Sequence, residues 1–443
     1  MVSTRFAGTD GVTLEAAKLA EVLEAAGHRA AWFAGELGER FQPGLLHPPA
    51  HFETPANRAL EAACFGVRTR SPATTATIRE RTEDLKAALR AFLAGHGVEV
   101  AVAQNALCLP MQLPLGLALT EVLVEQGMPA LAHHHDFWWE RERFAPNAAA
   151  DVLGAAFPPI LPGMGHLVIN SLAAAELARR RGMAATVLPN VMDFERGPDR
   201  PGDPDRFRRA AGLAGDDVLL LQPTRVVPRK GIETTIDLAA ALDGPVRVVV
   251  THAEGDEGVG YGARLREQAR RLGVDLRFVP VEAGGGDGPG PAPRSSTHGA
   301  RVSGSTSARR ARPRRRSLTG APADASALTS TLADAYAAAD LVCYPSTWEG
   351  FGNALLEAFF HRRPALVNRY AVYAADIAPA GVRCIELDGG LAPEAVGQVR
   401  TLLAHPERWR EAVEANYEAC RRHFSYATVR ERVLPLLDRV AAT

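Results

Sequence analysis

The sequence predicts an α/β protein of two Rossmann-like domains, whose parallel sheets face each other across a cleft. Short apolar runs typical of strands alternate with stretches of helical periodicity along most of the 443 residues. Strands separated by helices of this length pair in parallel through right-handed crossovers. The chain is also too long for one hydrophobic core and fits two domains of about 200 residues each.

The first block of alternating elements is expected over residues 1–195 as an N-terminal domain. In chain order we expect a helix over 12–28, a strand over 29–35, a helix over 77–97, a strand over 99–104, a helix over 113–127, strands over 129–135 and 167–171, a helix over 171–182 and a strand over 185–190. Only residues 1–7 precede the first loop, so the first strand is expected to be short, or the natural start lies further upstream.

A linker rich in Gly, Pro and Asp is expected over 196–215, followed by a second domain over 216–415. Its strands are expected over 218–224, 246–252, 276–281 and 339–346, and its helices over 231–244, 261–273, 329–340 and 353–363. Two helices that meet near residues 424–426 are expected to end the chain, with 416–443 as a separate C-terminal segment.

Residues 283–327 interrupt the second block and have the composition of a segment that cannot bury a core. Eight arginines and no acidic residue lie between Asp287 and Asp324. Three explanations stay open, namely a flexible basic insert, an arm that binds RNA or a membrane surface, and an out-of-frame stretch. The segment therefore carries no weight in assigning a function.

The composition limits the classes of function. A net charge of -1 gives no general attraction to nucleic acid or acidic membranes, so no nucleic-acid partner is expected. Neither a signal peptide nor an apolar run of about 18 residues is present, so no membrane span and a cytoplasmic location are expected. The five cysteines show no paired spacing, and we expect them to be reduced.

Two carboxylates, Glu349 and Glu357, flank a tight turn between a strand and a helix. In wound α/β sheets, ligands bind where the carboxyl ends of strands meet helix N-termini. Helix-end amides and close backbone approach suit a phosphate, whereas carboxylates suit hydroxyl groups. A nucleotide sugar carries both kinds of group and would satisfy both.

A cationic pair, Arg225 and Lys230, lies on another strand-to-helix connection of the same domain. Arginine offers a planar fork and lysine a compact charge, which together suit a diphosphate. An isolated pair of this kind is more often a pair of solvated loop charges. Its occurrence at a strand end of the domain that also holds the carboxylates favours the diphosphate site.

The two motifs resemble those of a known enzyme family. EGFGNALLE is similar to the Glu-x7-Glu signature of the retaining glycosyltransferases of family four, which have the GT-B fold, and TRVVPRKG resembles their Arg-x4-Lys element. The resemblance implies that Glu349 contacts the donor sugar, that Glu357 contacts the ribose diol, and that Arg225 and Lys230 stabilise the leaving diphosphate without an obligatory metal. The turn residues Gly350, Phe351, Gly352 and Asn353 would then bind the donor.

The same resemblance extends to the first block. Gly8 and Gly11 match the glycine-rich first loop of the family, where backbone approaches the donor phosphate. His135 lies where relatives carry a histidine that touches the donor sugar near the reacting carbon. In GT-B proteins the last helix commonly crosses back to the first domain, and the C-terminal segment is suitably placed for this.

The acceptor site is expected in the first domain, around HHHDFWWERER. Asp136, Trp138, Arg141 and Arg143 are its candidate residues, together with Asn105 at the end of the preceding strand. An arginine clamp would suit an acceptor that carries a carboxylate or phosphate. A metal pair of His133 and His135 is the rival interpretation, although no cluster elsewhere offers a third ligand, and we expect no metal site.

The expected activity is transfer of a hexose, mannose or glucose, from a nucleotide sugar to a small polar acceptor, with an anionic group on the acceptor left open. A narrower resemblance, to the subset that includes mannosylglucosyl-phosphoglycerate synthases, implies GDP-mannose as donor, and UDP-glucose stays open. A GT-B sugar-nucleotide epimerase and a non-catalytic nucleotide-sugar sensor are the alternatives. The oligomeric state is not indicated.

Overall fold

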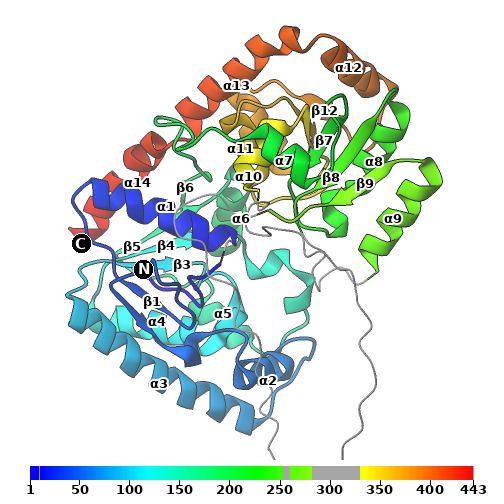
Figure 1. Ribbon diagram of the computed structural model, residues 1–443. Helices are drawn as coiled ribbons and strands as arrows, with labels where there is room; N and C mark the ends of the chain where they lie inside the picture. The colour runs from blue at the N-terminus through cyan, green and yellow to red at the C-terminus, as the bar shows by residue number, and fades with distance from the viewer. Residues whose placement is uncertain (9, 253–259, 282–329, 443) are drawn as a thin grey trace, which may run out of the picture.

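The computed structural model describes residues 1–8, 10–252, 260–281 and 330–442. The expected low-complexity segment 283–327 lies outside the described residues. Two parallel sheets make up the core of the molecule, as the sequence predicts (Figure 1). One has the strand order β3-β4-β5-β6, beside the separate pair β1-β2, and the other has the order β12-β11-β10-β7-β8-β9.

The first sheet is covered by helices on both faces. Its strands are β3 (Ala101–Gln104), β4 (Ala130–His134), β5 (Met164–Val168) and β6 (Thr186–Val187), and the separate pair consists of β1 (Trp32–Ala34) and β2 (Gly44–Leu46). The main helices of this half are α1 (Gly11–Ala25), α3 (Pro72–His96), α4 (Leu113–Gln126) and α6 (Ser171–Arg181). Val102, Leu131 and Leu167 pack against α1, whereas Ala101, Ala103, Ala130 and Ala132 pack against α3 and α4. Side chains that alternate along each strand thus fill two separate layers.

The last helix, α14 (Tyr426–Ala441), packs on the first sheet although it follows the second one in the chain. Val433 and Leu437 lie in the same apolar cluster as Leu19 of α1 and Leu131 of β4. Figure 1 shows α14 beside α1. Helix α13 (Arg410–His423) precedes α14 and leads to it from the second sheet. The chain therefore passes between the two sheets twice.

The second sheet follows the same two-layer plan. Its strands are β7 (Val218–Gln222), β8 (Val246–Val250), β9 (Asp275–Phe278), β10 (Leu341–Tyr344), β11 (Ala365–Asn368) and β12 (Ile385–Leu387). Its main helices are α8 (Ile232–Ala241), α9 (Tyr261–Leu272), α10 (Leu332–Ala338), α11 (Asn353–Phe360) and α12 (Pro393–Ala404). Leu219 and Val342 face the cluster that contains α10 and α11, and Leu220 and Leu341 face the cluster that contains α8 and α12.

Some elements differ from the sequence prediction. Helix α2 (Pro55–Cys64) and α5 (Ala150–Ala156) were not predicted, and α3 begins at Pro72 because Ser71 caps it. Helix α7 (Pro204–Ala210) lies within the expected linker, where Asp203 caps its first turn. The short first strand is reduced to isolated bridges, in which Val2 pairs with both Phe33 and Ala103.

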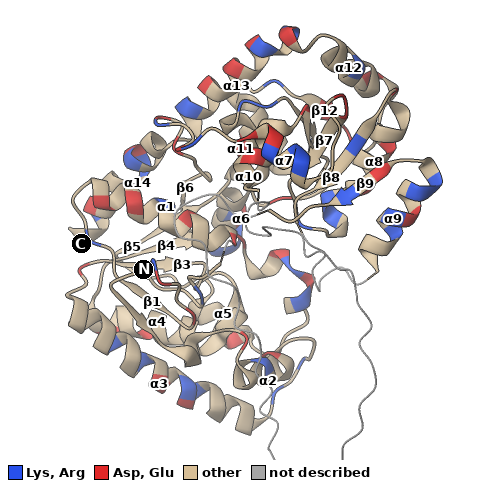
Figure 2. Cartoon of the chain, viewed as in Figure 1, with Lys and Arg blue, Asp and Glu red and all other residues tan. Residues whose placement is uncertain are grey.

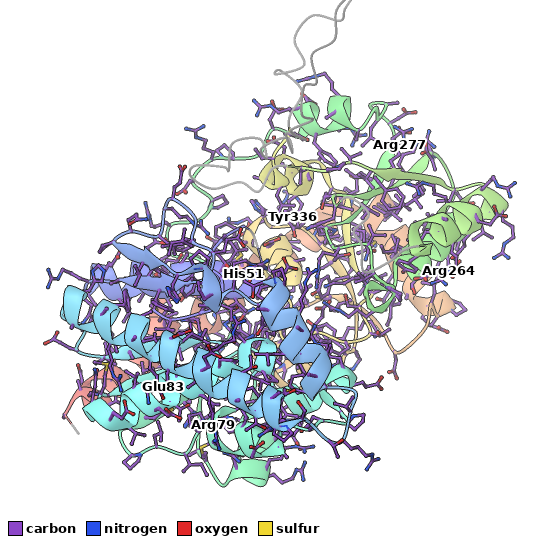
Figure 3. The ribbon with its side chains drawn as sticks, turned by 90° about the horizontal axis from the view of Figure 1, so that it is seen from below. His51, Arg79, Glu83, Arg264, Arg277 and Tyr336 are labelled. Carbon is purple, nitrogen blue, oxygen red and sulfur yellow. The ribbon has the colours of Figure 1, made fainter. Side chains whose placement is uncertain are left out.

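The charged residues lie mainly on the outer helices, where both signs are interspersed (Figure 2). Arg79 and Glu83, for example, lie on the exposed side of α3, whereas Tyr336 lies in the interior (Figure 3). Among the described residues, no helix is long and apolar enough to cross a membrane. All five cysteines have free thiols in the structure.

Candidate active site

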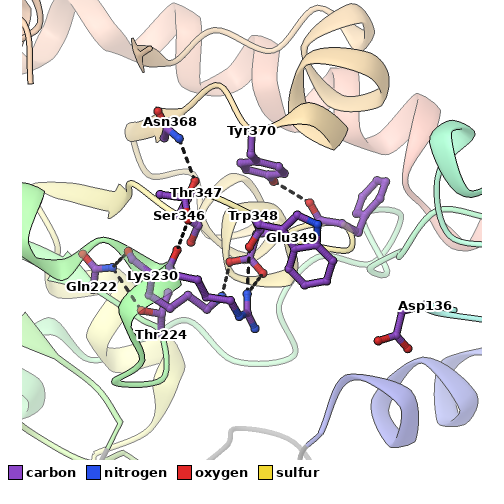
Figure 4. A network of polar contacts seen from close by, with 12 residues as sticks. Asp136, Gln222, Thr224, Lys230, Ser346, Thr347, Trp348, Glu349, Asn368 and Tyr370 are labelled. Carbon is purple, nitrogen blue, oxygen red and sulfur yellow. Dashed lines mark hydrogen bonds and ion pairs between the residues drawn. The ribbon is translucent and has the colours of Figure 1, made fainter. Parts of the chain in front are cut away.

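Lys230 and Glu349 meet at the carboxyl ends of two neighbouring strands. Lys230 follows β7 and Glu349 follows β10, and these strands pair in parallel in the centre of the sheet. The Lys230 ammonium donates a hydrogen bond to Oε1 of Glu349, and both side chains are about nine-tenths buried (Figure 4). Two residues 119 positions apart in the chain thus form one ion pair.

Arg229 is a third member of this cluster and was not predicted from the sequence. Its Nη1 donates to Oε2 of Glu349 at 2.8 Å and to the carbonyl of Trp348 at 3.0 Å. The carbonyl of Arg229 in turn accepts from the Thr347 amide at 2.9 Å. In the sequence, Arg229 resembles a solvated loop charge. Its place directly before the motif residue Lys230 was the only signal that could have identified it as part of the site.

The charges in this cluster influence one another. Burial raises the pKa of the Glu349 carboxyl, but Lys230 and Arg229 outweigh that effect, and the net shift is downward. Burial lowers the pKa of the Lys230 ammonium, while the carboxylate of Glu349 opposes the change. The carboxylate is therefore held ionised by two cations in a largely water-free position.

Buried polar groups fix the backbone of this cluster. Gln222, at the end of β7, donates to the Lys230 carbonyl at 3.0 Å and accepts from the hydroxyl of Thr235 at 2.5 Å. Asn368, at the end of β11, donates to the Ser346 carbonyl at 3.1 Å (Figure 4). Neither Gln222 nor Asn368 belongs to a recognisable motif, so these supports could not be predicted from the sequence.

The turn between β10 and α11 requires glycine. Gly352 has φ = 142°, and a Cβ there would lie 2.4 Å from the hydroxyl oxygen of Tyr370. That hydroxyl donates to the Phe351 carbonyl at 2.6 Å and so closes the turn. Phe351 itself is buried. The predicted donor-binding residues Gly350 to Asn353 therefore form one rigid connection that leads from Glu349 into the helix of Glu357.

Glu357 lies on α11, the helix that follows the donor-binding turn. Its Oε2 accepts a hydrogen bond of 2.8 Å from the Tyr336 hydroxyl. Burial raises the pKa of the Glu357 carboxyl, and this hydrogen bond opposes the increase. Its other oxygen, Oε1, receives no hydrogen bond from any residue that the structure describes.

Asn353, at the start of α11, contacts the first half of the molecule. Its side chain accepts a hydrogen bond from Asn190 and lies 3.5 Å from Oε1 of Glu15. A Cβ on Gly11 would lie 3.9 Å from the Asn353 amide nitrogen. Gly11, the first residue of α1, is thus brought next to the donor motif. Gly8 lies earlier in the same loop with φ = 73°.

His135 is a second point at which the halves approach. The carbonyl of His135 lies 3.6 Å from the position of a Cβ on Gly350, and Asn170 donates to the Gly350 carbonyl at 2.8 Å. The amide of His135 donates to Oδ1 of Asn105 at 3.0 Å. Burial lowers the pKa of the His135 imidazole to about 4, and within the described part of the chain its Nε2 has no hydrogen-bond partner.

The predicted acceptor residues fall into two groups. Asp136 accepts from Asn105 at 3.3 Å and from Nε of Arg141 at 2.6 Å, so these three side chains are connected. Trp138 donates its indole N–H to the Phe157 carbonyl and packs in an apolar cluster, and Arg143 lies over the Phe144 ring at 4.6 Å. Asp136 faces the donor cluster from the other side in Figure 4.

Two further predictions concern Arg225 and the metal pair. Arg225 lies exposed on the connection after β7 and is not among the hydrogen-bond partners of Glu349. The rings of His133 and His135 lie 4.4 Å apart, and Nδ1 of His133 is engaged by Gln104 at 3.0 Å. Among the described residues, no group of three His, Cys, Asp or Glu side chains could hold a metal ion.

Two parallel sheets whose carboxyl edges carry these groups define the GT-B fold. Solved structures with this fold include HepE from Anabaena in complex with UDP and glucose, with a TM-score of 0.63 at 14% identity over 99% of this chain and 98% of that one. WaaG, a glycosyltransferase involved in lipopolysaccharide biosynthesis, matches with a TM-score of 0.58 at 15% identity over 97% of each chain.

Sequence comparison leads to the same class. The family of glycosyl transferases group 1 matches residues 307–405. The mannosylglucosylglycerate synthase of Thermotoga maritima is 31% identical over 393 residues, which are 82% of this chain and 80% of that enzyme. The enzyme of the same name from Petrotoga mobilis is 27% identical over 87% of this chain and 86% of its own length. The chain belongs to the group 1 glycosyltransferases, and it is an enzyme rather than a non-catalytic sensor.

Proposed function

We propose that this glycosyltransferase moves a mannosyl group from GDP-mannose to a small anionic acceptor of the glucosylglycerate type, with retention at the anomeric carbon. The meeting of Lys230 and Glu349 at one sheet edge carries the donor part of the proposal. The similarity to two enzymes named mannosylglucosylglycerate synthase supports the choice of sugar and acceptor. UDP-glucose is the competing donor, because HepE was solved with UDP and glucose.

In the proposed reaction the bond between the anomeric carbon and the diphosphate oxygen breaks, and the acceptor hydroxyl oxygen forms the new glycosidic bond. The proton of that hydroxyl passes to the leaving diphosphate. Negative charge then grows on the leaving diphosphate, where Lys230 and Arg225 stabilise it together with backbone amides at the helix ends. Glu349 binds sugar hydroxyls and Glu357 the ribose diol. Gly8, Gly11 and the turn residues 350–353 bring backbone close to the donor.

His135 completes the proposed donor site from the other half of the molecule. Its imidazole is neutral near pH 7 because burial lowers its pKa to about 4, so it can act as a hydrogen-bond partner for the sugar. Asp136, with Asn105 and Arg141, would contact the acceptor, and Trp138 and Arg143 would line the outer part of that site. The same proposal includes a domain division at 195 and 216 and a separate C-terminal segment over 416–443. It also includes a cytoplasmic location and activity that is independent of a divalent metal.

The function is tested by incubating the protein with GDP-mannose or UDP-glucose and with glucosylglycerate, with and without a chelator. With GDP-mannose we expect a product with the mass of a hexosyl glucosylglycerate. NMR should show that its new anomeric carbon has the same configuration as the anomeric carbon of the donor. Arg271→Gln, an exposed residue of α9 far from the cluster, is the matched control and should leave the rate unchanged. No product with either donor would contradict the proposal.

A further inference from the structure

Glu349 has two cationic partners, one for each of its oxygens. Lys230 binds Oε1, and Arg229 binds Oε2 at 2.8 Å. Only 9% of the Glu349 side chain is exposed. A carboxylate in such a position is strongly destabilised when it loses its only counter-ion, because little water is available to replace it. A second cation therefore matters most when the first one is drawn away.

The two cations are held differently. Arg229 is fixed at three points, because its guanidinium also donates to the Trp348 carbonyl and its own carbonyl accepts from the Thr347 amide. Among the described residues, Glu349 is the only hydrogen-bond partner of the Lys230 ammonium. Lysine has a flexible stem and three donors, whereas arginine holds a carboxylate through a planar fork. Lys230 is therefore the cation that can turn toward another anion.

We propose that Arg229 is a positioning residue, which keeps Glu349 charged and in place when the donor diphosphate attracts Lys230. This inference rests on the proposed function, because it assumes that Lys230 binds the diphosphate. In the structure Lys230 and Glu349 neutralise each other. When the diphosphate arrives, Lys230 exchanges one anion for another, and Arg229 remains as the counter-ion that orients Glu349 toward the sugar hydroxyls.

A direct contact between Arg229 and the diphosphate is the rival explanation, and a double-mutant cycle on nucleotide affinity separates the two. GDP is titrated into wild-type protein, Arg229→Met, Glu349→Gln and the double variant, with UDP in its place if only UDP binds the wild type. We expect Arg229→Met to weaken binding about tenfold in the wild-type background, a typical size for coupling between neighbouring charges. In the Glu349→Gln background the same change should alter affinity less than about twofold.

The controls keep the outcome unambiguous. Arg271→Met, an exposed change on α9, should not alter the affinity, and Arg229→Gln replaces Arg229→Met if the latter does not fold. An equal loss in both backgrounds would mean that Arg229 contacts the diphosphate itself, and no loss in either would mean that it has no role. Both results overturn the inference. Failure of both GDP and UDP to bind the wild type would contradict the proposed function, and the inference with it.

Discussion

Lys230 and Glu349 form a buried ion pair between the connections that follow β7 and β10. Both groups lie at the same carboxyl edge of the sheet, where the proposed reaction would bring a diphosphate and a sugar together. Charges that are already held at the site lower the cost of reorganisation during the reaction, and in this proposal only Lys230 has to change its partner when the diphosphate binds. The predictions that follow test each part of this arrangement.

Glu349→Gln should abolish most of the transfer activity while nucleotide binding persists. Glutamine has nearly the same shape, but its neutral amide oxygen accepts hydrogen bonds from sugar hydroxyls less strongly than the carboxylate does. We expect kcat to fall by about two to three orders of magnitude, as is typical for loss of a group that acts on the transition state. Steady-state kinetics and GDP titration check this. Unchanged turnover would show that Glu349 is not part of the catalytic site.

Lys230→Met should weaken nucleotide binding, which Glu349→Gln leaves intact. It removes the cation proposed to bind the diphosphate, so affinity for GDP should fall by about tenfold or more. Affinity for guanosine should change little, because guanosine carries no phosphate. Calorimetric titration with both ligands measures this difference. Equal effects on GDP and guanosine would indicate a general structural defect.

Gly352→Ala should destabilise the donor-binding turn. Its φ of 142° is unfavourable for alanine, and the new Cβ would lie 2.4 Å from the Tyr370 hydroxyl oxygen. We expect a loss of about 1–3 kcal/mol in the free energy of unfolding. Tyr370→Phe should relieve part of the added cost, so the two changes should not be additive.

Urea unfolding of wild type, the two single variants and the double variant provides the measurement. Gly397→Ala is the matched control, because this glycine lies in α12 with nothing within 4 Å of the added Cβ. Alanine is the better helix former, so the control should be neutral or slightly stabilising. A Gly352→Ala protein as stable as wild type would show that the turn adapts.

His135 should titrate with a pKa near 4, because its imidazole is buried. The folded pKa lies below the ordinary value of 6.5, so the unfolded state binds the proton first as pH falls. Its contribution to stability is therefore complete above pH 6.5 and is lost as pH falls toward 4. NMR titration of the ring and pH-dependent unfolding of His135→Asn test this, with exposed His28→Asn as control. A pKa of about 6.5 would contradict the buried, neutral state.

Strands, helices and the two motifs could be predicted because their signals are local. The run VLLLQ before Lys230 and the run LVCY before Glu349 indicate central strands, and strand ends are where sites form. Helix α2 was missed because it is short. Its ten residues cover fewer than about three helical turns, so their apolar pattern, with Leu60 and Cys64 buried, occupies too small a window to stand out.

The supports of the site could not be predicted, because they depend on contacts between distant segments. Asn190 reaches Asn353 across 163 positions, and Asn170 reaches the Gly350 carbonyl across 180. Their residue types are common at loops and helix caps, so nothing local marks them. Arg229 was missed for a different reason, since neighbouring basic residues on a loop are usually solvated.

The most direct test of the account is thermal stabilisation of wild type and Lys230→Met by GDP, UDP, ADP and their sugar conjugates. A ligand that binds the folded state raises the melting temperature by mass action. We predict a clear increase with GDP and GDP-mannose for the wild type, and a much smaller one for Lys230→Met. No increase with any nucleotide, or an equal increase in both proteins, would contradict a diphosphate site built around Lys230 and Glu349.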